Sequence, residues 1–352
     1  MMENKIENVN EEIRRIQEQQ EAKNRIRRRR RRKRLAKRVL LSLLLVCVVT
    51  SAILFLYFPL VRKDFRFLPF LKPKAQEIQN YTDRIEDPEH SLVLTFADVG
   101  EGDSTILYDP KRESALIIDG GTQPYASHVV LCAKKFGNVR DVRLILTHPH
   151  SDHAQGLTEI VGSKLLPVIG LYYSAPTTGE SGFAPLRMQI AAQGLPMVPL
   201  KAGDTLAFGE AVIRIVSPKN EPYEDLNNAS LALVIEHDGH KTLVAGDMVR
   251  EAEDLLCEDE SLAQLICDVD LLRVGHHGSN SSTSYRFLDL TYPKIAVISV
   301  GADNPYGHPS ENVLSRLADL GRSRSGGITV LRTDEEGDIS FVSAPDGIKR
   351  IK

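Results

Sequence analysis

The chain has few of the residues that stabilise small disulfide-rich folds or build aromatic cages. Its 352 residues include four cysteines and no tryptophan. Cys47 falls in an apolar stretch, which leaves Cys132, Cys257 and Cys267, too few for a disulfide framework in a domain this large. A Cys257–Cys267 bridge and a reduced pair are both compatible with the sequence. Without tryptophan, a cage for a quaternary ammonium ligand would have to use Tyr or Phe.

Charge is distributed unevenly. Residues 1–38 contain 15 Lys/Arg and 6 Asp/Glu, a net charge of +9, which leaves −12 for the remainder of a chain whose total is −3. Residues 39–60, "VLLSLLLVCVVTSAILFLYFPL", carry no charge, and as a helix they would span about 30 Å of hydrocarbon. The stretch is longer than the apolar part of a signal peptide and ends in bulky residues, so we expect one uncleaved transmembrane helix.

The basic run sets the expected orientation. "NRIRRRRRRKRLAKR" at residues 24–38 favours a cytoplasmic N-terminus and attraction to anionic lipid. We therefore predict a basic, polar helical segment at 1–38, a transmembrane helix at 39–60 and a linker at 61–90. The body, residues 91–345, would form one domain on the outer side of the cell membrane.

Short apolar runs rich in Val, Ile and Leu recur from residue 91 onward, and each has the length of a strand. Helical patterns lie between some of them, at 127–137, 154–162 and 310–321. This mixture predicts sheets covered by helices. The runs are LVLTFADV, STILY, ALIID, VRLILT, VIGLYY, AVIRIVS, LALVIEH, KTLVAGD, VDLLRVG, KIAVISV, GITVLRT and ISFVS.

One loop is crowded with metal-binding side chains. "THPHSDH" places His148, His150, Asp152 and His153 directly after a predicted strand and before a predicted helix. Loops at strand ends are where α/β proteins bind ligands. Imidazoles and carboxylates together suit zinc, manganese or iron. This spacing predicts two neighbouring metal positions.

Two metal ions need more ligands than this loop offers, and two further segments supply them. Asp247 ends the run "TLVAGD", where a carboxylate can bridge two cations, and His276 and His277 directly follow "LLRVG". We expect these three strand ends to meet at one rim and to form a centre for two divalent ions, zinc or manganese.

As a set, these motifs resemble the metallo-β-lactamase superfamily, and within it the hydrolase domain at the carboxyl end of ComEC-type competence proteins. The resemblance covers about residues 91–345. It implies an α/β (α+β) fold, a four-layer αββα sandwich with the metals at the strand-end rim. The segments that carry it are FADVGEGDSTIL, LIIDGG, THPHSDH, NNASLALVIEH, AGDM, LLRVGHHGS and AVISVGADNPYGHP.

The resemblance also implies a role for each ligand. His148 and His150 would hold the first metal, and Asp247 would bridge to the second. The second metal would be held by Asp152, His153 and His277, while His276 would touch the substrate; the residues alone leave His276 and His277 interchangeable.

Three features depart from the usual pattern of the resembling proteins. His150 stands where ComEC-type domains often have Asp, and Glu101 replaces Gln in "DVGEGD". Many superfamily members carry another metal-binding His where this chain has Asn227 or Asn228, so the first metal is expected to be held more weakly than the second.

Four residues are candidates for substrate contact. Asp103 ends the "DVGEGD" turn, which is either a structural hairpin or a loop lining the site. His308 precedes a predicted helix, where an anion is favoured, or is a capping or buried residue. Asn228 and Ser279 complete the set of candidates.

The expected chemistry is hydrolysis by a metal-bridged hydroxide. Asp152 and Asp247 would orient it and accept its proton, and His276 would stabilise the developing charge. The first hypothesis is a membrane-anchored, extracytoplasmic phosphodiesterase or nuclease, with DNA among the substrates and no protein partner inferred. The alternatives are a cell-surface esterase acting on phosphorylcholine or teichoic acid, and a non-catalytic surface protein that has kept the fold.

The acidic body argues against strong nonspecific DNA binding, which needs several Lys/Arg contacts to phosphate. A local basic rim would be the exception. The candidates for it are Lys134, Lys135, Arg140, Arg143, Arg273 and Arg286.

Overall fold

A computed structural model describes residues 81–177, 179–219, 223–323 and 325–351. The predicted basic segment (1–38), the predicted transmembrane helix (39–60) and residues 61–80 of the predicted linker lie outside these ranges. Within them, no helix combines the length and the apolar character needed to cross a membrane.

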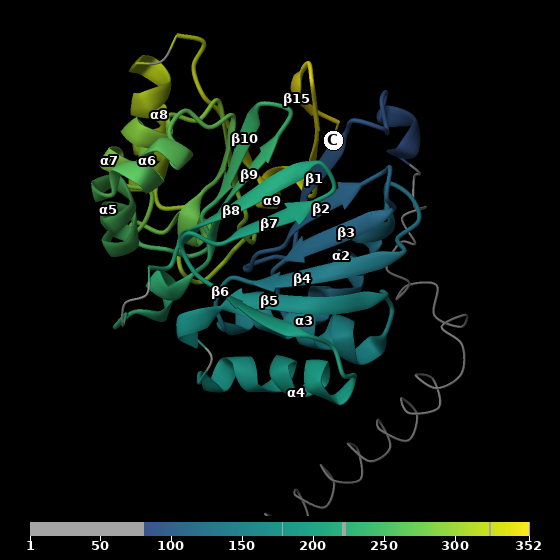
Figure 1. Cartoon of the computed structure of the whole chain (residues 1–352). Helices are drawn as coiled ribbons and strands as arrows, with labels where there is room; N and C mark the ends of the chain where they lie inside the picture. Colours follow the sequence, from purple (N-terminus) through teal and green to yellow (C-terminus); the bar gives the residue numbers. More distant parts are fainter. Residues whose placement is uncertain (1–80, 178, 220–222, 324, 352) are drawn as a thin grey trace, which may run out of the picture. The chain divides into compact units, whose positions relative to one another are not determined.

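The described residues form two mixed sheets (Figure 1). The first has the order β15-β14-β1-β2-β3-β4-β5-β6 and the second has the order β13-β12-β11-β10-β9-β8-β7. The strands of the first sheet are β1 (Leu92–Phe96), β2 (Thr105–Asp109), β3 (Ser114–Ile118), β4 (Asp141–Leu146), β5 (Val168–Ser174), β6 (Met197–Leu200), β14 (Ile339–Ala344) and β15 (Gly347–Arg350). Those of the second are β7 (Thr205–Phe208), β8 (Ala211–Ser217), β9 (Ala232–His237), β10 (His240–Val244), β11 (Leu271–Arg273), β12 (Ile295–Ile298) and β13 (Thr329–Arg332).

Both faces of each sheet are buried, which explains the continuous apolar runs in the sequence. In β9, Leu233 and Ile235 belong to a core shared with Leu107 and Ile145 of the first sheet, so the two sheets pack face to face. The alternate residue Val234 points to a different core, made with the helices. Successive side chains of the strand therefore point alternately into the core between the two sheets and into the core between the sheet and its helices.

Helices cover the outer face of each sheet, which gives the four layers α, β, β and α (Figure 1). Figure 1 shows α3 and α4 along the first sheet and α5 to α8 gathered beside the second. The first group is α2 (Ala126–Lys134), α3 (Ser151–Ser163) and α4 (Ala184–Ala192); the second is α5 (Arg250–Glu258), α6 (Glu260–Ile266), α7 (Tyr285–Thr291) and α8 (Glu311–Ser323), with the short α9 (Thr333–Glu336) after β13.

The fold extends past the predicted limits of 91–345 at both ends. Ile85 belongs to the core beneath α2 and α3, although no apolar run surrounds it in the sequence. Residues 347–350 form β15, which pairs with β14. None of the three described cysteines is in a disulfide, so the Cys257–Cys267 bridge is not formed.

Close packing of two glycines fixes the position of α3. A Cβ atom added at Gly156 would lie 1.8 Å from the carbonyl oxygen of Gly120. The Gly156 amide donates to the Gly121 carbonyl at 2.9 Å, and the Gly120 amide donates to the His153 carbonyl at 2.9 Å. The absence of side chains therefore lets the helix that carries His153 rest directly on the turn after β3.

We expect Gly156→Ala to lower the free energy of unfolding by about 1–3 kcal/mol or more, because the new methyl group forces backbone apart in a packed region. Gly162→Ala is the matched control on the same helix. Its Cβ would meet nothing closer than 3.6 Å, and alanine favours a helix over glycine by about 1 kcal/mol. Urea denaturation of the two variants should give shifts of opposite sign; equal shifts would contradict the packing argument.

Candidate metal centre

The predicted ligands meet at the carboxyl ends of strands from both sheets. His148 follows β4 by two residues, and Asp152 and His153 lie in the first turn of α3. Asp247 follows β10, and His277 lies in the 3-10 turn Gly275–Gly278 after β11. Because β4 and β10 end toward the same rim, His153 and Asp247 become neighbours although they lie 94 positions apart in the sequence.

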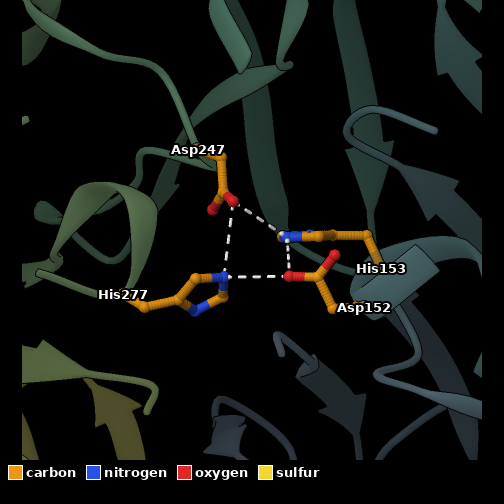
Figure 2. Close-up of side chains that lie close together, drawn as sticks. All are labelled: Asp152, His153, Asp247 and His277. Atoms are coloured by element: carbon orange, nitrogen blue, oxygen red, sulfur yellow. Dashed lines mark hydrogen bonds and ion pairs between the residues drawn. The ribbon is translucent and has the colours of Figure 1, made fainter. Parts of the chain in front are cut away.

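Four side chains form one cluster, in which Asp152, His153, Asp247 and His277 point toward one another (Figure 2). One Oδ or Nε2 atom from each lies within 4.8 Å of the others. Asp247 Oδ2 is 3.1 Å from His153 Nε2 and 3.3 Å from His277 Nε2. Asp152 Oδ2 is 3.6 Å from His153 Nε2 and 3.3 Å from His277 Nε2. This donor set, two imidazoles and two carboxylates, is typical of a zinc-type site.

Burial and charge together set the protonation of this cluster. Burial alone would lower the pKa of His277, but the Asp247 charge and hydrogen bonds to Asp152 and Asp247 outweigh it and raise the pKa to about 10. Burial alone would raise the pKa of Asp247, but His277 and His153 hold it well below its usual value. Without metal, the imidazole rings of His153 and His277 are therefore protonated. A metal ion binds only the deprotonated nitrogen, so metal binding should release protons.

The raised pKa of His277 predicts how metal-free stability depends on pH. A group with a folded-state pKa of about 10 and an unfolded pKa of about 6.5 contributes stability that is fully present below pH 6.5 and is lost as pH rises through 10. We expect the difference in unfolding free energy between the original chain and His277→Gln, measured in a chelator, to shrink from pH 6.5 to pH 10. An unchanged difference would mean that His277 carries no proton in the metal-free fold.

His148 and His150 lie beside this cluster rather than within it. The His148 ring is fully buried, with its centroid 4.2 Å from that of His153 and 4.6 Å from that of His150. His148 Nε2 is 3.9 Å from Asp247 Oδ2. Burial and the neighbouring His153 hold the pKa of His148 well below its ordinary value, so its ring is neutral, the form that binds metals.

Asp119 orients two of these histidine segments. Its carboxylate accepts hydrogen bonds from the Thr147 amide at 2.8 Å and the Thr147 hydroxyl at 2.7 Å. It also lies 2.8 Å from His153 Nδ1, which leaves Nε2 of His153 to face the cluster. Carboxylate–imidazole pairs of this kind fix the tautomer of metal-binding histidines.

Asp103 lies behind the cluster, in contact with a buried arginine. Asp103 and Arg273 are both fully buried, and Asp103 Oδ2 is 2.9 Å from Arg273 Nε. Arg273 also donates to the Gly246 carbonyl at 2.6 Å and lies 3.5 Å from Asp247 Oδ1. The predicted substrate role of Asp103 is therefore not supported, because its carboxylate faces Arg273 and not solvent.

Asn228 is also buried, and its side chain makes structural contacts. Its side chain is buried and caps the start of α5: the amide oxygen accepts from the Val249 amide at 3.1 Å, and the amide nitrogen donates to Glu251 at 2.7 Å. These bonds occupy the amide group that was predicted to contact substrate.

His276, Ser279 and His308 lie on loops next to His277. The His276 ring centroid is 6.1 Å from that of His277 and 5.7 Å from that of His308, and burial lowers the pKa of His276. Ser279 is half-buried, with its hydroxyl 2.9 Å from that of Ser281. The rings of His276 and His308 thus lie beside the ring of His277.

The six candidates for a local basic rim all make local contacts, and Lys134 donates to the Leu165 carbonyl at 3.0 Å. Arg273 is buried, Lys135 is buried beside Asp338 at 3.5 Å, and Arg286 contacts Glu258 at 3.2 Å. Arg140 pairs with Glu113, and Arg143 donates to the Ala207 carbonyl. The cationic groups of these residues are therefore engaged in local contacts.

Three residues at the site have contacts that were not predicted from the sequence. Asp119 was not a candidate, Arg273 was a candidate only for a basic rim, and Glu101 was noted only as the replacement for Gln in a turn. Asp119 had a visible signal, since it ends the apolar run "ALIID" in the same way that Asp247 ends "TLVAGD". Arg273 lies inside a strand and gave no such signal, because its partners are distant in sequence.

Comparison with known proteins agrees with this geometry. The sequence profile of the metallo-beta-lactamase superfamily matches residues 97–302, more than half of the chain. The chain belongs to the metallo-β-lactamase superfamily. This is a superfamily of metal-dependent hydrolases that bind divalent ions, often two, and the implied αββα sandwich is the architecture described above.

The relatives of this superfamily member include competence proteins. It is 30% identical to ComE operon protein 3 of Bacillus subtilis over 262 residues, which are 69% of this chain and 32% of the relative. It is 30% identical to competence protein ComA of Neisseria gonorrhoeae over 263 residues, 74% of this chain and 34% of the relative. The chain thus spans about a third of these relatives, and the matched part is a metallo-β-lactamase domain of the ComEC type.

Among solved structures, the chain is similar to the metallo-β-lactamase fold protein YhfI of Bacillus subtilis. The TM-score is 0.47 at 11% identity, over 72% of this chain and all of YhfI.

The residues present fit divalent metal ions. His148 Nε2 is buried and makes no hydrogen bond with the described residues. A buried polar atom of this kind is costly unless something satisfies it, and an imidazole nitrogen is a donor atom that zinc and manganese accept. Asp152, His153, Asp247 and His277 would hold one ion, and His148 and His150 would complete a second site with Asp247.

Proposed function

We propose that this metallo-β-lactamase domain is a metal-dependent phosphodiesterase, with nuclease activity as one form of it. The observation that carries the proposal is the buried cluster of Asp152, His153, Asp247 and His277 at a rim that also holds His276 and His308. A cation centre next to further imidazoles suits an anionic ester. The competence-protein relatives support a phosphodiester such as DNA as the substrate.

Each side chain would have a role that follows from its position in the cluster. Divalent cations, when bound, lower the pKa of a coordinated water to about 7 and attract the anionic phosphate. Asp152, whose side chain is 28% exposed, is the cluster carboxylate that a water molecule can approach, and it would accept the proton. Asp247, 2% exposed, would hold the two ions together. His276 would donate a hydrogen bond to the charge that develops on the phosphoryl oxygens.

The location proposed for this activity follows from the sequence alone. Residues 39–60 would anchor the chain in the membrane, the basic run 24–38 would stay at the anionic cytoplasmic surface, and the domain would lie outside. Protease added to intact cells should then remove the metallo-β-lactamase domain; full protection would refute this orientation.

The proposal is tested by assaying the full chain on bis-p-nitrophenyl phosphate and on plasmid DNA. Each assay is run once with added Mn²⁺ or Zn²⁺ and once with a chelator. We expect metal-dependent release of p-nitrophenol and nicking of the plasmid. If the small diester is cleaved and the DNA stays intact, the nuclease hypothesis is rejected. The remaining hypothesis is then a cell-surface esterase that acts on phosphorylcholine or teichoic acid. No hydrolysis and no bound metal would indicate a surface protein that has kept only the fold.

A further inference from the structure

Glu101 connects two loops that are 200 residues apart in the sequence. One of its carboxylate oxygens, Oε2, accepts a hydrogen bond from the Gly301 amide at 3.1 Å. The other, Oε1, lies 3.0 Å from His308 Nδ1. Both side chains are largely buried, with 17% of Glu101 and 13% of His308 exposed. Glu101 therefore holds both ends of the 301–308 loop.

The loop between these ends is itself rigid. The Asn304 side-chain amide donates to the Gly301 carbonyl at 2.9 Å and to the His308 carbonyl at 2.7 Å. Its oxygen accepts from the His308 amide at 3.0 Å. The position of the His308 ring is consequently set by the loop, and Glu101 decides which ring nitrogen carries the hydrogen.

A carboxylate offers only acceptors. His308 Nδ1 must therefore carry a hydrogen to bond with Oε1, and in the neutral ring Nε2 is then left with a lone pair. No described residue makes a hydrogen bond with Nε2 of His308. The ring centroid is 6.3 Å from that of His277 and 5.7 Å from that of His276, so the ring that carries this acceptor lies next to the cluster.

We propose that Glu101 is a positioning residue that makes His308 a hydrogen-bond acceptor toward the substrate, and that the site consequently prefers phosphodiesters with a hydroxyl group beside the scissile phosphate. The inference rests on the proposed phosphodiesterase activity. A phosphate diester anion has no hydrogen to donate, so an acceptor at Nε2 matches a neighbouring hydroxyl, as in ribonucleotides or polyol phosphates. Deoxyribonucleotides lack this donor and are expected to be the poorer substrates.

Replacement of Glu101 by Gln reverses the polarity of His308 with almost no change in shape. The Gly301 amide can only donate, so it takes the single amide oxygen of Gln. The NH₂ group then faces His308 Nδ1 and donates to it, which moves the ring hydrogen to Nε2. In Glu101→Gln, Nε2 is therefore expected to donate. Glu159→Gln is the matched control, because Glu159 lies exposed on α3 and bonds only Gln123 among the described residues.

The tautomer can be measured directly, without turnover. The ¹⁵N shifts of His308 are recorded in the full chain loaded with Zn²⁺, at a pH at which the ring is neutral, and assigned by their loss in His308→Asn. We expect hydrogen on Nδ1 in the original chain and in Glu159→Gln, and on Nε2 in Glu101→Gln. Hydrogen on Nε2 of the neutral ring in the original chain would overturn the proposal.

Turnover of adenylyl-adenosine and of its 2′-deoxy counterpart tests the consequence. We expect kcat/KM for the hydroxyl-bearing diester to exceed that for the deoxy diester, and the ratio to fall about five- to tenfold in Glu101→Gln. The intrinsic reactivity of the hydroxyl group affects the ratio of kcat/KM values equally in both proteins. It therefore cancels when the two ratios are compared. An equal ratio in the two proteins would overturn the inference alone, whereas no cleavage of either diester would reject the phosphodiesterase proposal itself.

Discussion

Asp247→Asn is expected to lower hydrolysis of bis-p-nitrophenyl phosphate more than about 100-fold and to lower the amount of metal bound per chain. The reason is that Asp247 lies in contact with both His153 and His277 and near His148. Changes in groups that only support metal ligands already cost about 10–100-fold, so loss of the central carboxylate should cost more. Metal content by mass spectrometry and initial rates, taken from the same samples, measure the two effects.

Asp319→Asn is the control for this experiment. Asp319 is an exposed carboxylate on α8 that pairs with Arg322, and its loss should leave both rate and metal content unchanged. An Asp247→Asn variant that kept its metal and most of its rate would show that the cluster in Figure 2 is not where the chemistry occurs.

Arg273→Met is expected to lower the free energy of unfolding by about 3–5 kcal/mol, the range for removing one partner of a buried ion pair. Arg273 is fully buried beside Asp103 at 2.9 Å and near Asp247 at 3.5 Å. Without the guanidinium group, two carboxylates are left in the interior without this cation. Denaturant unfolding in a chelator separates this effect from any change in metal binding.

A double-mutant cycle with Asp103→Asn tests the assignment. In the Arg273→Met background, Asp103→Asn removes a charge that has lost its partner, so it should cost less than in the original chain or restore some stability. Arg286→Met is the control, because Arg286 forms exposed ion pairs with Asp254 and Glu258 and exposed pairs contribute about 0–1 kcal/mol. Strictly additive effects of Arg273→Met and Asp103→Asn would contradict the pairing.

Strands buried on both faces were predictable, and three of the four edge strands were not. Each of the twelve apolar runs named from the sequence overlaps a strand of the two sheets. The three strands missed were β6, β7 and β15, and each lies at the edge of a sheet. β6 and β7 are half exposed and β15 contains Lys349 and Arg350. An edge strand needs no continuous apolar run, because only part of it packs against the core.

The short spacing of residues in the sequence indicated the types of metal ligand. It did not indicate the distant residues that hold the ligands and their loops in place. His148, Asp152 and His153 stand out because they lie within six positions. The pairs Arg273–Asp103 and Glu101–His308 join residues 170 and more than 200 positions apart. No local pattern reports such a contact, since it arises only when the two sheets pack. Asn228 was misassigned for the same reason: its partner, the start of α5, is adjacent in space but lies beyond β10.

The order of strands in the first sheet has a consequence for biosynthesis. β1 is flanked on one side by β14, which is translated after every other strand of the two sheets except β15. The first sheet, whose strand β4 precedes the helix that bears Asp152, therefore stays incomplete until residues 339–344 have been translated, and His277 follows a strand of the other sheet. A nascent polypeptide released before β14 would lack a finished scaffold for the cation centre, so early termination should yield inert fragments rather than an unregulated hydrolase.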